Sequence, residues 1–406
     1  MSENWKTYKL SDFININPLV KLKSNEPYSF VEMKDLHANL RTVKPSDFRL
    51  LRGGARFQNG DTLFARITPC LQNGKICQVR DLKNSVGFGS TEFLVFRGKE
   101  GVSDTDFVYY LSREPFVRQF AETNMIGTSG RQRVAKEAFQ NIQLELPSLQ
   151  EQLAIASILS ALDDKIELNL QMNKTLEEMA MALYKHWFVD FGPFQNGKFV
   201  ESELGMIPEE WEVVSIYNLV DVIYGAPFKS KLFNEDKKGY PLIRIRDLKL
   251  GNPQYYTEEN HVNKTIIKKG DILAGMDALF VPYAWSGNEG VMNQRVVFFK
   301  PKIETVKRRY IYEAAKPWLK FYEGAKVGTT VIHLSKSDID NFKFIYPQNH
   351  HILTPFNNEI DAFHDLIISN DTEIATLTTL RDTLLPKLIS GQIRVKDAEQ
   401  MEAASL

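Results

Sequence analysis

The stretch that decides the architecture runs from Leu149 to Trp187 and reads LQEQLAIASILSALDDKIELNLQMNKTLEEMAMALYKHW. It contains no proline or glycine, and its apolar residues recur at helical spacing. Steps of four and three residues alternate along the series Leu162, Ile166, Asn169, Asn173, Leu176, Ala180, Leu183 and Trp187. This is the a/d pattern of a coiled-coil seam. A helix of this length would extend about 60 Å.

A second series with the same phase lies 201 residues further along the chain. It consists of Phe363, Ile367, Asn370, Ile374, Leu377, Arg381, Leu384 and Leu388. Each helix could pack on its own neighbouring domain. The equal heptad phase instead favours packing of the two helices on each other.

The segments outside the helices are also repeated. The stretch Gly60–Ala65 matches Gly270–Gly275, and Asn141–Pro147 matches Asn341–Pro347. Their offsets of 210 and 200 residues differ as loop insertions would make them differ. Short apolar runs such as 93–96 and 296–299 predict strands. The chain therefore divides into globular segments 1–147 and 201–347, which alternate with helical segments 148–200 and 348–406.

Charge follows the same division. The formal charges are +5 for residues 1–147, −3 for 148–200, +2 for 201–347 and −5 for 348–406, which give the net charge of −1. This separation suits anion-binding globular domains carried on a helical, protein-binding spacer.

Composition excludes several classes of protein. Hydrophobic residues make up 43% and charged residues 25%, which is typical of globular domains. No run approaches the roughly 18 apolar residues of a membrane helix, and the first residues lack the plan of a signal peptide. The only cysteines, Cys70 and Cys77, are expected to be free thiols. We therefore expect a cytoplasmic protein with no membrane contact.

The strongest local motif is Gly127-Thr128-Ser129-Gly130-Arg131-Gln132-Arg133-Val134. Its glycines permit a tight backbone excursion, and its hydroxyls can donate to phosphate oxygens. Arginine reads guanine and glutamine reads adenine through paired hydrogen bonds. A solvated turn is the alternative. The second copy, Gly328-Thr329-Thr330-Val331-Ile332-His333-Leu334, keeps the glycine and the hydroxyls but replaces Arg-Gln-Arg, as two different half-sites would require.

Further candidates for DNA contact are polar residues on turns next to predicted strands. For any one of them a surface role is the alternative to base contact. They are Arg66, Lys75, Ser90 and Thr91 in the first globular segment, and Arg244, Arg246, Asn293, Gln294 and Arg295 in the second.

Motifs of catalysis are missing from the sequence. It has no P-loop, no Gly-x-Gly-x-x-Gly turn at Gly87, and no Asn/Asp-Pro-Pro-Tyr/Phe tetrapeptide. Neither His350-His351 nor the cysteine pair has the spacing of zinc ligands. We therefore expect a non-catalytic chain with no metal or cofactor of its own.

These features resemble the specificity (S) subunits of type I restriction–modification systems over nearly the whole chain. The resemblance rests on Ile207-Pro208-Glu209-Glu210-Trp211, the Gly60–Leu63 turn, Gly89-Ser90-Thr91-Glu92-Phe93 and the Gly127–Val134 loop. It also rests on Leu146-Pro147 with Glu151-Gln152, on Leu183–Phe188 and on Leu385-Pro386-Lys387-Leu388-Ile389-Ser390-Gly391.

The resemblance implies an α+β (mixed α/β) fold. Two pseudo-symmetric target recognition domains with β-sheet cores would be separated by two long helices paired as an antiparallel coiled coil. It further implies recognition of a bipartite, asymmetric target in double-stranded DNA. Two methylation (M) subunits that bind S-adenosylmethionine, and restriction (R) subunits that use Mg²⁺ and ATP, would be the partners. The alternatives are a single-chain methyltransferase or nuclease, and a specificity subunit of a differently organised restriction system.

Two details of the helix pair can be predicted. Antiparallel pairing of equal helices brings their midpoints together, which predicts that Asn169 and Asn370 approach each other, with their amides paired directly or through water, and fix the register. The alternative is that both point to solvent and that the seam runs through neighbours such as Leu170 and Ile368. The second helix is expected to begin several residues late, near Thr354-Pro355, because this pair suits a first turn.

Overall fold

The computed structural model describes residues 5–128, 130–140, 142–325 and 332–395. The chain forms two compact units. The first unit combines Met1–Glu167 with Thr376–Leu406, and the second unit comprises Leu168–Ala375. Each long helix therefore contributes residues to both units.

The first unit contains two sheets that share a core. One sheet has the strand order β2-β10-β7-β8-β4 and the other has the order β5-β3-β9-β6, while β1 pairs separately with β13. The core between them is apolar and includes Phe57, Leu63, Val79 and Phe93. The strands are β1 (Lys6–Lys9), β2 (Ile14–Ile16), β3 (Pro27–Val31), β4 (Thr42–Val43), β5 (Asp47–Leu50), β6 (Ala55–Gln58), β7 (Thr62–Ala65), β8 (Ile76–Val79), β9 (Val86–Gly89), β10 (Phe93–Gly98), β11 (Met125–Ile126), β12 (Arg133–Val134) and β13 (Gln143–Leu146).

Short helices complete this unit: α1 (Leu10–Phe13), α2 (Thr105–Arg113) and α3 (Pro115–Thr123). Asp104 caps α2 by accepting a hydrogen bond from the Phe107 amide. Proline at the first position of α3 costs no helical hydrogen bond, so a second helix can begin immediately after the first.

The second unit repeats this plan. Its sheets have the strand orders β17-β25-β22-β23 and β18-β20-β19-β24-β21, with β16 paired to β26 and β14 to β15. The strands are β14 (Phe199–Ser202), β15 (Gly205–Pro208), β16 (Trp211–Ser215), β17 (Val220–Tyr224), β18 (Phe233–Asn234), β19 (Tyr240–Ile243), β20 (Tyr256–Thr257), β21 (Ile266–Ile267), β22 (Ile272–Gly275), β23 (Pro282–Ala284), β24 (Gly290–Met292), β25 (Val296–Pro301) and β26 (Lys343–Pro347). Its helices are α5 (Ile216–Leu219), α6 (Arg308–Ala325) and α7 (Lys336–Ile339).

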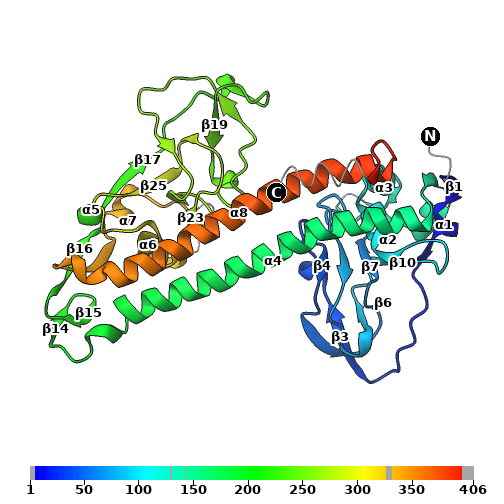
Figure 1. Cartoon of the computed structure of the whole chain (residues 1–406), viewed down its shortest axis with the longest axis horizontal. Coiled ribbons are helices and arrows are strands. Elements are labelled where there is room, and N and C mark those ends of the chain that lie inside the picture. The colour runs from blue at the N-terminus through cyan, green and yellow to red at the C-terminus, as the bar shows by residue number, and fades with distance from the viewer. Residues whose placement is uncertain (1–4, 129, 141, 326–331, 396–406) are drawn as a thin grey trace. The chain divides into compact units, whose positions relative to one another are not determined.

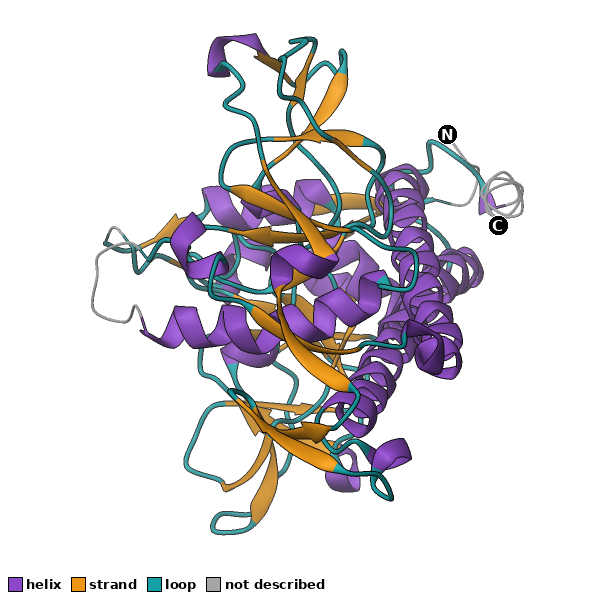
Figure 2. Ribbon diagram, turned by 90° about the vertical axis from the view of Figure 1, so that its left-hand side faces the viewer, coloured by secondary structure: helices purple, strands orange, loops and turns teal. Residues whose placement is uncertain are grey.

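Strand pairing confirms the internal repeat. The parallel pair β3–β9 of the first unit corresponds to the parallel pair β19–β24 of the second. In each case an antiparallel strand flanks either side: β5 and β6 in the first unit, β20 and β21 in the second. Figure 2 shows these strands gathered in the globular parts, apart from the long helices.

The two long helices are α4 (Leu149–Phe188) and α8 (Thr354–Ile389). Every residue of the two heptad series is buried or half-buried. Segments of α8 lie along α4 in antiparallel direction (Figure 1). The helix α8 begins at Thr354, as expected, and a short 3₁₀ turn over His350–Leu353 precedes it.

A buried ion pair joins the helices in the first unit. One Arg381 guanidinium nitrogen lies 2.6 Å from an Asp163 carboxylate oxygen, and both side chains are 2% exposed. The Tyr110 hydroxyl, on α2, donates to the other Asp163 oxygen at 2.8 Å. This ion pair therefore ties α8, α4 and α2 of the first unit together.

Amide groups occupy the seam in the second unit. Asn169 and Asn370 are both buried, but they do not bond to each other. Asn370 donates to Asn173 at 2.8 Å, and Asn169 donates to Glu373 at 2.6 Å. Both residues are buried at the seam, as expected, but each amide donates to a residue about one helical turn away from the expected partner instead of to that partner.

The family-like motifs at the start of α4 hold the first unit together. Glu151 accepts hydrogen bonds from the Trp5 indole and from Arg394, each at 3.0 Å. Gln152 is buried, accepts from the Asp104 amide, and donates to the carbonyls of Pro147 and Val102. These two side chains therefore fasten Trp5, Arg394 and the loop before α2 to the helix.

Removing the cation of the buried ion pair should destabilise the protein. Arg381→Ala leaves the Asp163 carboxylate buried and uncompensated, which costs about 3–5 kcal/mol. Urea unfolding measures the loss. Thr383→Ala, an exposed change on the same helix, should stay within about 0.5 kcal/mol. A loss for Arg381→Ala no larger than that of this control would contradict the role of the ion pair.

Asp371 should make stability depend on pH. Burial raises the pKa of the Asp371 carboxyl to about 6; the charge of Glu177 adds to the rise, and the hydrogen bond from Asn173 opposes it. The native state therefore holds this proton more tightly than the unfolded chain, whose aspartates titrate near 4, so stability falls as pH rises from about 4 to about 6.

We expect Asp371→Asn to stabilise the protein at pH 7 by on the order of 1–3 kcal/mol and to change little near pH 4. Urea unfolding at several pH values tests this, with exposed Asp365→Asn as the control. Equal effects of Asp371→Asn at both pH values would argue against the raised pKa.

Candidate nucleic-acid interface

In each unit one backbone segment forms hydrogen bonds with two others, an arrangement that we term the backbone crossing. In the first unit the Arg66 amide donates to the Glu92 carbonyl, and the Val134 amide donates to the Arg66 carbonyl, at 3.0 and 2.9 Å. In the second unit the Met276 amide donates to the Arg295 carbonyl at 2.9 Å, and the Leu334 amide donates to the Met276 carbonyl at 2.7 Å. The bridges Ile67–Arg133 and Asp277–His333 occupy corresponding places. The repeat thus places Arg133 and His333 on one common frame.

The side chains at the crossing differ between the units. In the first unit Arg133 forms a two-pronged ion pair with Glu92, with nitrogen–oxygen distances of 2.7–3.0 Å. The Thr68 amide donates to the Gln132 carbonyl, and the Gln132 amide donates to the Thr68 hydroxyl, both at 3.0 Å. Arg131 is exposed, and its side chain has no hydrogen bond or ion pair within the described chain. Arg131 is therefore available for contact with DNA, whereas Arg133 already has an intramolecular partner.

In the second unit His333 takes the place of Arg133. An Arg295 guanidinium nitrogen lies 2.9 Å from His333 Nε2, and His333 Nδ1 lies 2.8 Å from an Asp277 carboxylate oxygen. His333 Nδ1 also lies 3.0 Å from the Met276 carbonyl oxygen and 3.2 Å from the same Arg295 nitrogen, so both ring nitrogens face polar groups. Arg133 is thus held by Glu92, whereas His333 lies between Arg295 and Asp277.

The remaining candidates of the first unit lie near this crossing. Ser90 and Thr91 line a pocket at the end of β9. Arg66 and Thr91 line a neighbouring hollow, and the Arg66 Nε is buried without a hydrogen-bond partner. Lys75 instead donates to the Met33 carbonyl at 2.8 Å, which gives it a structural contact. Thr128 is exposed, and Ser129 lies outside the described residues.

The candidates of the second unit fall into two groups. Arg244 stacks 4.3 Å above the Tyr255 ring, and the oxygen of buried Asn293 caps the Gln294 amide. Arg246 and Gln294 are exposed. Thr329 and Thr330 lie outside the described residues. Arg246 and Gln294 therefore have the most accessible polar ends.

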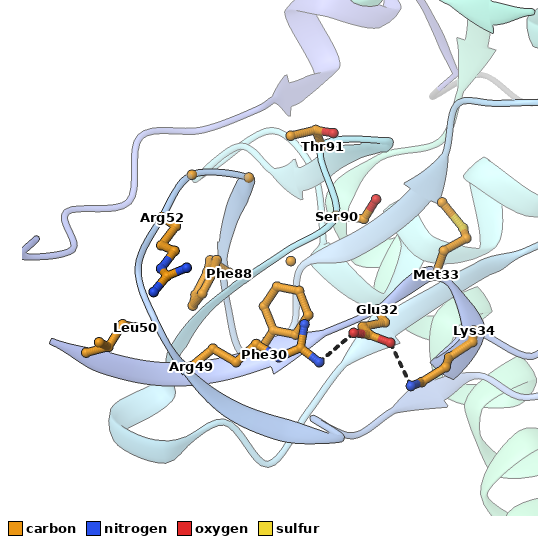
Figure 3. Close-up of a pocket in the computed structure, with 13 residues that line it drawn as sticks. Phe30, Glu32, Met33, Lys34, Arg49, Leu50, Arg52, Phe88, Ser90 and Thr91 are labelled. Atoms are coloured by element: carbon orange, nitrogen blue, oxygen red, sulfur yellow. Dashed lines mark ion pairs between the residues drawn. The ribbon is translucent and has the colours of Figure 1, made fainter. Parts of the chain in front are cut away.

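The pocket in the first unit has a volume of about 880 Å³ and opens between β3, β5 and β9 (Figure 3). Glu32 pairs with Lys34 at 2.7 Å and with Arg49 at 2.6 Å, and these hydrogen bonds lower the pKa of the Glu32 carboxyl. The Arg49 guanidinium also stacks 4.1 Å above the Phe30 ring. Arg52 lies at the same pocket and has no dashed contact in Figure 3.

Sequence reasoning missed the lining residues Arg49 and Arg52. The signal present was three arginines, Arg49, Arg52 and Arg56, around the pair Gly53-Gly54. The sequence did not show that these arginines line a pocket with Ser90 and Thr91, because β3 and β9 are distant in sequence and become neighbours only in the sheet.

The site offers binding chemistry: guanidinium groups, hydroxyls and amides on loops. Among the described residues no group of three or more His, Cys, Asp or Glu side chains could hold a metal ion. Both cysteines are free, as expected, and burial raises the pKa of the Cys77 thiol to about 11, so this thiol stays protonated. No helix in the described ranges is long and apolar enough to cross a membrane.

Comparisons with known proteins agree with this architecture. The family model for the type I restriction modification DNA specificity domain matches residues 2–178 and again residues 208–368. These two matches cover both copies of the internal repeat.

Two curated relatives extend over most of the chain. The type I restriction enzyme MjaIX specificity subunit of Methanocaldococcus jannaschii is 30% identical over 317 residues, which cover 74% of this chain and 71% of the relative. The HindI specificity subunit of Haemophilus influenzae is 25% identical, and the alignment covers 96% of this chain and all of the relative.

A solved structure shows the same fold. The crystal structure of a type I restriction–modification system S subunit from M. genitalium matches with a TM-score of 0.56 and 15% identity, covering 95% of this chain and 96% of that one.

The fold and the matches define a DNA-binding subunit with two repeated recognition domains and paired long helices. The chain belongs to the family of type I restriction–modification specificity subunits, which are non-catalytic DNA-recognition subunits.

Proposed function

We propose that this chain recognises a bipartite, asymmetric sequence in double-stranded DNA, with one half-site read by each unit. The observation that carries this proposal is the shared backbone crossing with different side chains: Glu92 and Arg133 in one unit, Arg295 and His333 in the other. The repeated frame places Arg133 and His333 equivalently, and different side chains at equivalent places select different bases.

The helix pair also suits a docking role for methylation subunits. On α4, within the second unit, Leu168, Met172 and Met179 are 53%, 40% and 46% exposed. Their spacing of four and seven residues puts them on one face of the helix. Exposed apolar stripes of this kind mark protein-binding surfaces, and methionine adapts well to a partner.

These two roles would place the chain in a complex with methylation (M) and restriction (R) subunits. Two M subunits would dock on the helices, bind S-adenosylmethionine and methylate adenine, and R subunits would join with Mg²⁺ and ATP to cleave. The specificity chain itself would contribute recognition and scaffolding. The purified chain assayed alone with S-adenosylmethionine, and with Mg²⁺ and ATP, should be inactive. Methylation or cleavage by the chain alone would favour the single-chain enzyme instead.

Arg131 should read a base in the half-site of the first unit. Its exposed guanidinium has no intramolecular partner in the described chain, so Arg131→Ala should cost about 1–3 kcal/mol and relax specificity in that half-site only. Binding of the assembled complex to DNA duplexes with single base-pair changes measures this. Uniform weakening on all sequences would identify Arg131 as a phosphate contact and contradict the base-reading role.

The paired helices should set the spacing of the half-sites, which we expect to lie about one turn of DNA apart. One heptad inserted into α4 alone should lengthen the recognised spacer or abolish recognition, because α8 no longer matches. One heptad inserted into both helices adds about 10 Å, which corresponds to about three base pairs. Methylome sequencing should then show both half-sites unchanged. Full-strength recognition at the original spacing would refute the helices as the ruler.

A further inference from the structure

The link between β5 and β6, residues 51–54, brings the basic residue Arg52 to the pocket of the first unit. Gly53 and Gly54 have φ values of +123° and +107°, which favour glycine. A Cβ at Gly54 would lie 2.0 Å from the Gly89 carbonyl oxygen. The link can therefore pass directly against the end of β9, where Ser90 and Thr91 line the same pocket.

Arg49, on β5, and Arg52, in the link, have different surroundings. Arg49 is engaged by Glu32 at 2.6 Å and Asp47 at 2.9 Å, so its charge is compensated within the protein. Arg52 is exposed, and no side-chain hydrogen bond or ion pair involves it among the described residues. In Figure 3 its guanidinium lies at the pocket beside Phe88, away from the ion pairs drawn there.

The corresponding link of the second unit joins β20 to β21 and has different chemistry. It is longer and contains no arginine. Glu259 accepts a hydrogen bond from the Lys229 amide, and Lys264 lies 4.9 Å above the Tyr240 ring, so both sides of the link are anchored. Between them Asn260, Val262 and Asn263 are exposed, with Val262 at 91%. The two units thus present different side chains at the same place in the frame.

We propose that Arg52 is a specificity-determining residue that reads a guanine in the half-site of the first unit. Its forked guanidinium matches the O6 and N7 acceptors of guanine in the major groove, and it has no intramolecular anion to release first. The proposal rests on the proposed function and adds a second reading element beside the Gly127–Val134 loop. The second unit, with no arginine in this link, would not read guanine in this way.

The test uses the chain assembled with its methylation subunits. Arg52→Ala should lower the preference for guanine at one position by about 10- to 100-fold, in the same half-site that Arg131→Ala relaxes. Arg52→Lys should lose most of this preference, because lysine keeps the charge but not the fork. Exposed Lys9→Ala, on β1 of the same unit, removes a charge outside the pocket and should leave every preference intact. Competition binding with singly substituted duplexes, and methylome sequencing, report each position.

Three results would overturn the proposal: unchanged preferences for Arg52→Ala, equal weakening on all sequences, or relaxation in the other half-site. An unchanged thermal midpoint of Arg52→Ala shows that its effect is on recognition. The proposed function fails separately, since an assembled wild-type complex with no sequence preference would refute it whatever Arg52 does.

Discussion

The structure depends on polar groups buried where two long helices meet. In the first unit Asp163 and Arg381 must face each other, since either charge alone would be costly inside the protein. In the second unit Asn173 accepts a hydrogen bond from Asn370 and donates one to Asp371, so these buried polar groups also need each other as partners. Apolar heptads would tolerate a slip by one turn, but these pairs would not. The antiparallel register therefore follows from polar satisfaction more than from apolar burial.

This register completes each recognition domain with the end of the other repeat's helix. The end of α8 belongs to the first unit, where a Cβ on Gly391 would lie 3.0 Å from the Trp5 ring. The end of α4 belongs to the second unit, where Phe188 packs edge-on against Trp211 at 5.4 Å. Trp5 in the first unit and Trp211 in the second thus both pack at the end of the other repeat's helical segment. Neither globular segment has all of its contacts without the partner repeat's helix.

Much of this architecture could be predicted from the sequence. Heptad spacing predicted both helices and their pairing, because the apolar period is a local property of the sequence and can be seen without knowing the partner helix. The late start of α8 was visible in Thr354-Pro355. The offset between Asn169 and Asn370 was not, because register depends on which polar groups find partners across the seam. The ion pair of Arg133 with Glu92 could not be predicted either, since the two residues are 41 positions apart and only the fold brings them together.

The separation between frame and recognition surface has a physical basis. At each crossing the buried residues Val134 and Leu334 supply the packing and the backbone hydrogen bonds, and these do not depend on the adjacent polar side chains. The exposed ends, Arg131 in one unit and Gln294 in the other, bury little area, so exchanging them changes stability little. A base contact, by contrast, distinguishes sequences by about 1–3 kcal/mol. Specificity can therefore change at the loops while the fold, and the helix register that orients it, stay the same.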